Sequence, residues 1–447
     1  MLPSTPTSAP QSLVSGTKVI AQASKTRWLV LLLLSVMYMI TYMDRTGISI
    51  AAPSMAKEFA LSDTTIGIVF SVFLWAYAIG QIPSGWLADR LGARLVLLII
   101  VPLWSLLTAL TAQAKGIVSL LEIRFTFGLA EAGAFPAATR GMQLWFPKSE
   151  RGIVHGITHC FSRLAIAVVP FLAVSIMVAF GWRWIFYFFG AAGLLWSLAF
   201  YRVYRNIPEE HPGVNCSELS HIRGTHPDGT IKASSHLQQR PPAPWKTIFC
   251  SPNMWYIAAG YCCFYYGTYF YVTWFPTYLL QYRHLSLNAV GTLASLPLVA
   301  GMAGDLAGGR LTDYLYKKTA KLRIARRAVG GPAMFLSAVC LIPAAMTHNV
   351  WMAMLSLTAS LFFLEMVVSP AWAVPMDVGG EYSGTVSGIM NMAGSLAASL
   401  SPIIFGILVQ RGRWIAPFFV SAGVLLTGAL IWIFLIDPDK SVVAQTA

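Results

Sequence analysis

Charge is scarce in this sequence. Only 11% of the 447 residues are Asp, Glu, Lys or Arg, whereas 56% are hydrophobic, and the mean hydropathy is +0.63. A soluble protein of this length cannot hide so much apolar surface from water. The composition therefore excludes an ordinary soluble globular protein and places most of the chain in a lipid bilayer.

Cysteine is also sparse, and the six cysteines are scattered, mostly within apolar runs (Cys160, Cys216, Cys250, Cys262, Cys263 and Cys340). Their spacing fits neither a disulfide framework nor a metal site. Catalytic loops and cofactor motifs are absent as well, so we expect no enzyme, no cofactor and no bound metal. Residues 1–26 lack the charged start and cleavage site of a signal peptide, and we expect a disordered cytoplasmic tail there.

Long apolar runs are what the sequence has in abundance. Runs of about 18 to 25 residues recur, each long enough to cross roughly 30 Å of hydrocarbon as a helix. A transmembrane barrel would need short alternating strands instead. Twelve spans are predicted, at residues 27–52, 62–86, 94–114, 117–140, 152–179, 182–205, 251–280, 287–310, 327–347, 350–376, 382–410 and 413–436. The predicted class is an all-α transmembrane protein.

The net charge of +13 could suggest nucleic-acid binding, but the positions of the basic residues argue against it. With twelve spans, both termini lie on one side, and that side carries 22 of the 31 Lys and Arg residues. Positive charge favours the cytoplasmic side of a membrane. The basic residues therefore predict cytoplasmic termini and no nucleic-acid partner.

Residues 206–250 interrupt the apolar pattern and divide the spans into six plus six, as in a duplicated transporter. We expect six-helix bundles at 27–205 and 251–436, a cytoplasmic middle loop, and a cytoplasmic tail at 437–447. The loop is too short for a signalling domain, which argues against a sensor.

Weak internal symmetry supports this division. GWLADRLGAR ends the second span and GGRLTDYLYKK ends the eighth. A conformational gate is predicted from the charged residues in these two stretches (Asp89, Arg90, Arg94 and Asp313). The alternative is two ordinary polar loops with positive charge that sets the topology.

Ionisable residues inside the spans are the most informative feature, because each costs roughly 2.5–3.5 kcal/mol at the bilayer centre. There are six in the predicted set: Asp44, Arg45, Arg124, Glu131, Arg163 and Glu365. Arg124 and Glu131 are seven residues apart and share one helix face. A carboxyl facing a closing cavity can exchange a proton, and an arginine can hold a substrate carboxylate. The alternative is that these charges only tie helices together.

Other polar residues also fall on shared helix faces. His155, His159 and Arg163 are four residues apart; two His could bind zinc, but no third ligand is evident, so we expect a water-lined face with Arg163 near the substrate. Glu365, Ser369 and Trp372 share another face. Span seven is rich in tyrosine (Tyr265, Tyr266, Tyr269, Tyr271 and Tyr278), which suits a carboxylate on a sugar chain or ring.

Several motifs occur in order along the chain: YMDRTGISIAAP, WAYAIGQIPSGWLADR, RFTFGLAEAGAFPAATR, WFPKSERG, EEHPGVN and TWFPTYL. With them, residues 27–436 resemble the major facilitator superfamily, and within it the anion:cation symporter family. The resemblance implies two six-helix bundles and alternating access. It also implies proton sites at Asp44 and Glu131, with Arg124 coupled to Glu131. Expected substrate contacts are Arg45, Tyr77, Ser369, Trp372 and Asn391.

The sequence departs from that family at four positions. Gly47 stands where Asn is common, Ser162 where sugar-acid permeases often have Gln, and Glu365 where glucarate-type permeases have Lys. Arg163 is an added charge. The acid Glu365 argues against a second substrate carboxylate at that end.

The predicted function is a monomeric, proton-coupled symporter of the bacterial inner membrane that imports a small organic anion, a sugar acid of the galactonate, glucarate or hexuronate type. Its expected partners are the anion, protons and membrane lipids. The alternatives are a phthalate-type or tartrate permease and an organic-anion exchanger.

Overall fold

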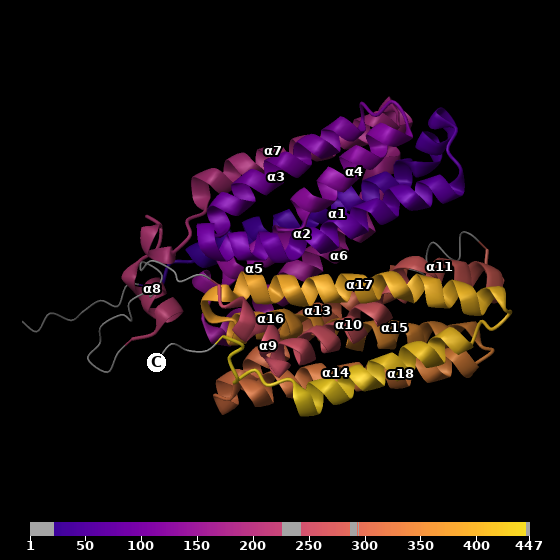
Figure 1. Ribbon diagram of the computed structural model, residues 1–447. Helices are drawn as coiled ribbons and strands as arrows, with labels where there is room; N and C mark the ends of the chain where they lie inside the picture. The colour runs from indigo at the N-terminus through magenta and orange to yellow at the C-terminus, as the bar shows by residue number, and fades with distance from the viewer. Residues whose placement is uncertain (1–21, 226–242, 287–292, 294, 444–447) are drawn as a thin grey trace, which may run out of the picture.

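A computed structural model describes residues 22–225, 243–286, 293 and 295–443 (Figure 1). The described part is helical and contains no strand. Most of the predicted N-terminal tail, residues 226–242 of the middle loop, the start of the predicted span 287–310 and the last four residues lie outside the described residues.

Among the described residues, those before residue 206 form seven α-helices. They are α1 (Thr26–Phe59), α2 (Asp63–Leu91), α3 (Ala93–Thr111), α4 (Ile117–Glu131), α5 (Ala134–Trp145), α6 (Arg151–Phe180) and α7 (Trp182–Val203). The fourth predicted span is divided between α4 and α5, which meet at Ala132 and Gly133. Helix α1 packs against α6 and α7, α2 against α4, and α3 against α7.

The second half repeats this plan after α8 (Cys216–Arg223) and α9 (Trp245–Cys250). It contains α10 (Pro252–Thr273), α11 (Phe275–Thr277), α13 (Ser295–Thr319), α14 (Leu322–Met346), α15 (Val350–Met366), α16 (Val368–Val378), α17 (Ser383–Gln410) and α18 (Ala416–Leu430). Helix α10 packs against α17, α13 against α15, and α14 against α18.

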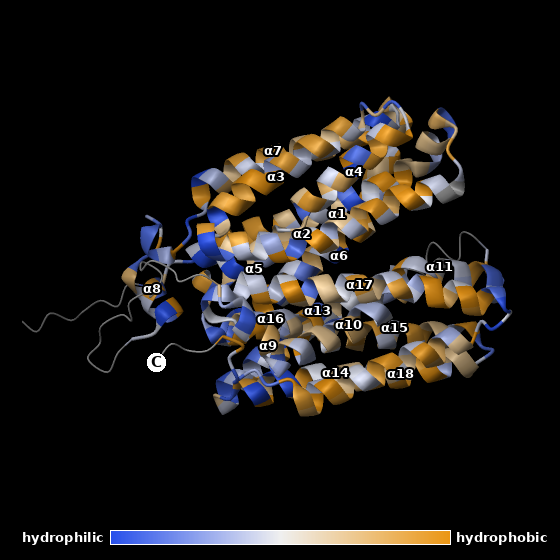
Figure 2. Ribbon diagram, in the orientation of Figure 1, coloured by the Kyte–Doolittle hydropathy of each residue, from blue (hydrophilic) through white to orange (hydrophobic). Residues whose placement is uncertain are grey.

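Nine helical segments in the described part are long and apolar enough to cross a membrane. Three predicted spans fall outside these nine: one is divided between α4 and α5, one is the tyrosine-rich α10, and one carries Asp305, Arg310 and Asp313 in α13. Apolar residues cover the outward faces of the helices, and polar residues gather near the ends (Figure 2). The architecture confirms the predicted two bundles of six spans.

The two bundles meet near α8 and diverge toward α11 (Figure 1). We call these the α8 end and the α11 end. The bundles touch along two seams, α2 against α17 and α6 against α13. Glycines allow the close approach. A Cβ atom on Gly85 would lie 2.3 Å from the Gly384 carbonyl oxygen, and one on Gly156 would lie 2.5 Å from the Asp305 carbonyl oxygen.

The EEHPGVN motif fastens the middle loop to the start of α1. The Asn215 side chain caps α8 by accepting a hydrogen bond from Glu218 N. The Glu218 carboxylate in turn accepts from the backbone N–H groups of Thr26 and Arg27. This part of the middle loop therefore lies at the same end of the molecule as the start of the first span.

Candidate functional site

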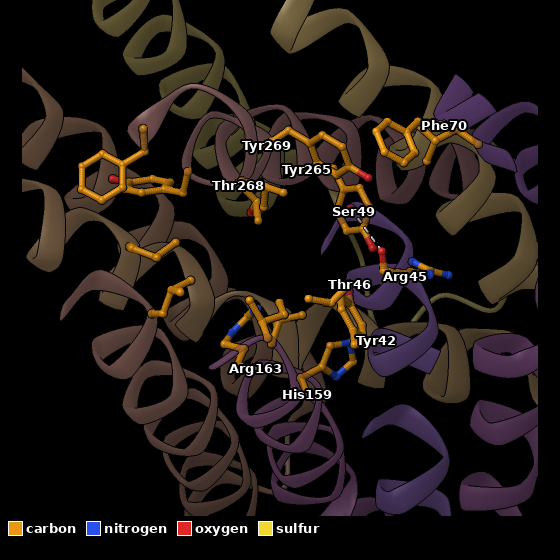
Figure 3. Close-up of a pocket in the computed structure, with 18 of the residues that line it drawn as sticks. Tyr42, Arg45, Thr46, Ser49, Phe70, His159, Arg163, Tyr265, Thr268 and Tyr269 are labelled. Atoms are coloured by element: carbon orange, nitrogen blue, oxygen red, sulfur yellow. Dashed lines mark hydrogen bonds between the residues drawn. The ribbon is translucent and has the colours of Figure 1, made fainter. Parts of the chain in front are cut away.

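A cavity of about 510 Å³ lies between the two bundles. Figure 3 shows Tyr42 and Arg163 on one side of it and Tyr265, Thr268 and Tyr269 on the other. The lining is mostly aromatic and apolar, and its cations are Arg45, Arg124 and Arg163. The cavity therefore combines aromatic faces with several guanidinium groups, which suits an anion with a carbon skeleton.

The cavity is closed toward the α8 end by successive contacts along α2. Phe70, Phe73 and Leu74 line it, and one turn deeper the Tyr77 hydroxyl accepts a hydrogen bond from Asn391 Nδ2 of α17 at 3.2 Å. A further turn on, Gln81 Nε2 donates to Ser395 Oγ at 3.2 Å. These contacts join the bundles below the cavity floor.

Asp89 caps the beginning of α17 at the deep end of this seam. Its buried carboxylate accepts from the backbone N–H groups of Gly384 and Thr385, at 2.9 and 2.6 Å, and from Thr385 Oγ1 at 2.7 Å. Arg140 Nε lies 3.8 Å away. A carboxylate at a helix N-terminus satisfies unpaired N–H groups and the positive end of the helix dipole.

Asp313 repeats this arrangement at the other seam, where it caps α6. It accepts from the backbone N–H groups of Gly152 and Ile153, at 2.9 and 2.7 Å, and lies 3.3 Å from Arg326 Nη1. The two acids predicted as gate residues thus hold matching helix ends across the bundles. The predicted arginines lie elsewhere: Arg90 contacts the ring of Trp86, and Arg94 donates to the Tyr201 carbonyl within the first bundle.

Arg151 and Arg326, which the sequence suggested only as topological charges, belong to the same seal. Arg151 Nη1 lies 2.7 Å from Asp377 Oδ1, and Arg326 Nε lies 3.0 Å from Asp377 Oδ2. Arg151, Arg326 and Asp377 lie far apart in the sequence, on different helices. No spacing along the chain therefore indicates that they form a network.

Arg45 and Glu131 form an ion pair beside the cavity. Arg45 Nε donates to the Glu131 carboxylate, at 3.3 Å from Oε1 and 3.1 Å from Oε2. Arg45 reaches the cavity, whereas Glu131 is fully buried behind it at the end of α4. The guanidinium carbon also lies 4.5 Å from the centroid of the Tyr77 ring. A cation that faces the cavity is therefore bonded to an acid that does not.

Arg124 and Asp44 are placed differently. Arg124 lines the cavity over the rings of Phe73 and Phe127, 4.6 and 4.7 Å from their centroids, and within the described residues it has no carboxylate within 4.0 Å. Asp44 is buried beside Arg45 but does not line the cavity. Neither carboxylate oxygen of Asp44 has a hydrogen-bond partner in the described part of the chain.

Arg163 on α6 joins the second bundle. Its Nε lies 2.8 Å from Asp305 Oδ2 on α13, and its Nη2 bonds to Glu365 Oε2 on α15. Arg163 and Glu365 were predicted from the sequence as charges within the membrane, whereas Asp305 was not. The available signal for Asp305 is an acid within the predicted span 287–310, next to the closely spaced glycines Gly301, Gly304 and Gly308. His159 also lines the cavity, with Nδ1 3.0 Å from the His155 carbonyl oxygen.

The other expected substrate contacts lie below the cavity in this conformation. Ser369 Oγ donates to the Asp305 carbonyl oxygen at 2.8 Å, and Trp372 Nε1 donates to the Tyr261 hydroxyl at 2.9 Å. Neither they nor Tyr77 and Asn391 line it. Of the tyrosines in span seven, Tyr265, Tyr269 and Tyr271 do, while Tyr266 and Tyr278 are buried elsewhere.

Two six-helix bundles that enclose a charged central cavity are the architecture of a membrane transporter. The family model of the Major Facilitator Superfamily matches residues 34–402. The chain belongs to this superfamily, which confirms that part of the resemblance inferred from its motifs, and it is a transporter and not an enzyme.

The chain is similar to several named transporters over almost its full length. It is 37% identical over 415 residues to "Probable sulfoacetate transporter" of Cupriavidus necator, covering 93% of this chain and 95% of that protein. It is 33% identical over 412 residues to "Probable galactarate/D-glucarate transporter" of Escherichia coli, covering 89% and 90%. A solved proton:xylose symporter shares the fold, with a TM-score of 0.74 at 14% identity and 93% and 98% coverage.

Proposed function

We propose that this protein imports a small organic anion of the sugar-acid type together with protons, as a member of the anion:cation symporters. The observation that carries the proposal is the ion pair between Arg45 and Glu131. It links a cation that faces the cavity to a buried acid, so that anion binding and protonation act on the same contact.

The coupling follows from competition for Arg45. While Glu131 is ionised, it occupies the Arg45 guanidinium; when Glu131 takes up a proton from the external solution, the guanidinium is free to bind a substrate carboxylate. Arg124, 4.6 Å above the Phe73 ring, provides a second cation for the same anion or for the ionised acid. Asp44, buried without a donor among the described residues, is the second proton site.

Release of the substrate requires the α8 end to open. We propose that the bundles 27–205 and 251–436 rotate relative to each other, and that Asp89 and Asp313 leave the helix ends that they cap. Protonation and substrate binding must favour the conformation open at the α8 end over the present one, since only a difference in binding between two states can shift their balance.

The orientation follows from the charge distribution. The α8 end corresponds to the side of the membrane on which the sequence places 22 of the 31 Lys and Arg residues. Positive charge is enriched on the cytoplasmic side. We therefore place this end, both termini and the middle loop in the cytoplasm of a bacterial cell, with the protein working as a monomer in the inner membrane. The present conformation is then closed toward the cytoplasm.

The named relatives suggest which anions to test. One relative is named for galactarate and glucarate, which supports a sugar acid. The more similar relative is named for sulfoacetate, and this favours a small sulfonate as the second candidate. The guanidinium groups of Arg45 and Arg124 can accept either a carboxylate or a sulfonate.

Uptake into proteoliposomes tests the proposal. Labelled galactonate, galactarate, sulfoacetate and phthalate are offered with an acidic outside and a neutral lumen. We expect concentrative uptake of a sugar acid or of sulfoacetate, alkalinisation of the external medium on substrate addition, and loss of accumulation with a protonophore. Substrate exchange that is indifferent to the pH gradient would instead identify an organic-anion exchanger.

A further inference from the structure

Three ionisable residues from both bundles meet at the floor of the cavity. Arg163 is contributed by α6 of the first bundle, Asp305 by α13 and Glu365 by α15 of the second. Asp305 and Glu365 are 0% and 1% exposed, whereas Arg163 reaches the cavity. We call these three residues the floor cluster.

The charges of the floor cluster do not balance. Two ionised carboxylates and one guanidinium leave one net negative charge, in a place closed to solvent on the carboxylate side. An unpaired buried charge is costly, and a single proton shared by the two acids makes the cluster neutral. An arginine cannot give up its proton, so only the acids can adjust the charge.

Among the described residues, no cationic side chain other than Arg163 lies within 4.0 Å of the Asp305 or Glu365 carboxylate. The titratable groups around it are His159 and Cys160 on α6, Tyr42 on α1, and Tyr265 and Tyr271 on α10. From α16, the Ser369 hydroxyl donates to the backbone of Asp305 and not to its carboxylate. Within the described residues, one carboxylate oxygen of Glu365 and both of Asp305 lack a hydrogen-bond donor of good geometry.

The cluster also lies where the bundles must separate. A Cβ atom on Gly301 of α13 would lie 3.2 Å from Glu365 Cγ and 3.5 Å from Arg163 Cδ, so the packing around it is close. Toward the α8 end, the same seam continues through Gly156 against Asp305 and Gly152 against Gly309. The floor cluster is therefore the last contact of the α6–α13 seam before the open cavity.

We propose that Asp305 and Glu365 form a further proton-binding site, located in the second bundle, and that Arg163 links its protonation to the opening of the α6–α13 seam. The proposal rests on the proton-coupled transport proposed above. In the present conformation Arg163 bridges the bundles. When the acid group of the substrate reaches Arg163 from the cavity, one carboxyl keeps its proton and the other takes one from the external water.

The neutral acid pair no longer attracts Arg163, and the seam can part. Both protons leave to the cytoplasm once the α8 end is open. The ionised carboxylates then attract Arg163 again and the seam reforms, and one carboxyl takes up a proton from the external water through the cavity, which restores the resting cluster. This site is distinct from Asp44 and Glu131, which lie in the first bundle, on α1 and α4. Protons bound in the second bundle therefore also contribute to driving transport.

The ratio of protons to substrate tests this proposal. It is measured in proteoliposomes from the membrane voltage or substrate gradient that just cancels a known pH gradient, for the unchanged protein and for the Glu365→Gln and Asp305→Asn variants. Each variant leaves a neutral pair with Arg163. We expect the ratio to fall by about one proton per substrate in both, because each keeps one fewer exchangeable proton. Glu122→Gln, which changes an exposed acid on α4, should keep the original ratio.

An unchanged ratio in both floor-cluster variants, with the unchanged protein still moving protons, would overturn the further site and leave the proposed function intact. Absence of any substrate-dependent proton movement in the unchanged protein would overturn both. If Asp305→Asn does not fold, Glu365→Gln decides. An infrared difference spectrum between acidic and alkaline pH gives a second reading: the band of a protonated carboxyl should weaken in Glu365→Gln relative to Glu122→Gln, and an equal band would count against the site.

Discussion

The hydroxyl of Tyr77 on α2 accepts a hydrogen bond from Asn391 Nδ2 on α17 at 3.2 Å. This contact joins the two bundles directly below the cavity. Both residues are expected to touch the substrate, so they are bonded to each other in the conformation in which the substrate has not yet reached them. Substrate binding must therefore break or replace this bond.

We predict that Tyr77→Phe weakens closure of the cavity floor. Loss of one neutral hydrogen bond costs about 0.5–1.5 kcal/mol, which shifts the balance of conformations by up to roughly tenfold. A double-mutant cycle with Asn391→Ala, measured on the apparent affinity for substrate, should show coupling between the two residues. Fully additive effects would mean that the bond does not contribute to the transport cycle.

The contact of Gly85 with Gly384 gives a second prediction. A Cβ atom on Gly85 would lie 2.3 Å from a backbone oxygen, which cannot move aside like a side chain. We expect Gly85→Ala to favour the conformation open at the α8 end. Distances between spin labels on the α8 ends of the two bundles should lengthen.

Gly67→Ala is the matched control on the same helix, because a Cβ atom there meets nothing within 4 Å. It should leave the spin-label distances unchanged. Equal distances in Gly85→Ala and Gly67→Ala would show that the glycine contact does not hold the seam.

Removal of the charge of Asp89 should also open the α8 end. Its carboxylate accepts three hydrogen bonds from the start of α17, and bonds to a charged group contribute about 1.5–3 kcal/mol each. We expect Asp89→Asn to increase labelling of a cysteine placed in the α2–α17 seam by a thiol reagent from the cytoplasmic side. Asp313→Asn should do the same for the α6–α13 seam.

The two variants control for each other, because each should affect its own seam more strongly. Unchanged labelling in both variants would show that Asp89 and Asp313 do not hold the seams closed.

Arg45→Lys tests the ion pair itself. Lysine keeps the positive charge but loses the planar guanidinium that contacts Glu131 and the Tyr77 ring. We expect the apparent affinity for the substrate to fall at least tenfold, with normal amounts of folded protein in the membrane. The affinity is measured by calorimetry of substrate binding to the purified protein. An unaltered affinity would mean that the acid group of the substrate binds elsewhere in the cavity.

The sequence was sufficient for the helical class, the two bundles and most of the charges within the membrane, because apolar runs and charge distribution are local properties of the chain. It could not supply the partner of each charge. Arg124 and Glu131 share a helix face, yet the Glu131 carboxylate pairs with Arg45 of α1 and not with Arg124. Ion pairs between different helices depend on how the helices pack, and the spacing of residues within one helix does not indicate this packing.

The partners of Asp305 were also not predictable from the sequence. The glycines around it indicate close packing, and they do pack closely, against Phe362 and Met366. Only the arrangement of α6, α13 and α15 shows that this acid meets Arg163 and Glu365. The positions of Ser369 and Trp372 were likewise beyond the sequence, since which residues face the cavity changes with the conformation.

Transport with and without a pH gradient, in Asp44→Asn and Glu131→Gln, tests whether these two acids couple proton movement to substrate uptake. Both variants and the Glu122→Gln control are reconstituted in proteoliposomes, and uptake of the identified substrate is measured with an acidic exterior and then as exchange at equal pH. We expect the control to accumulate substrate above equilibrium, whereas both variants retain exchange but lose accumulation. Full concentrative uptake by both variants would contradict it.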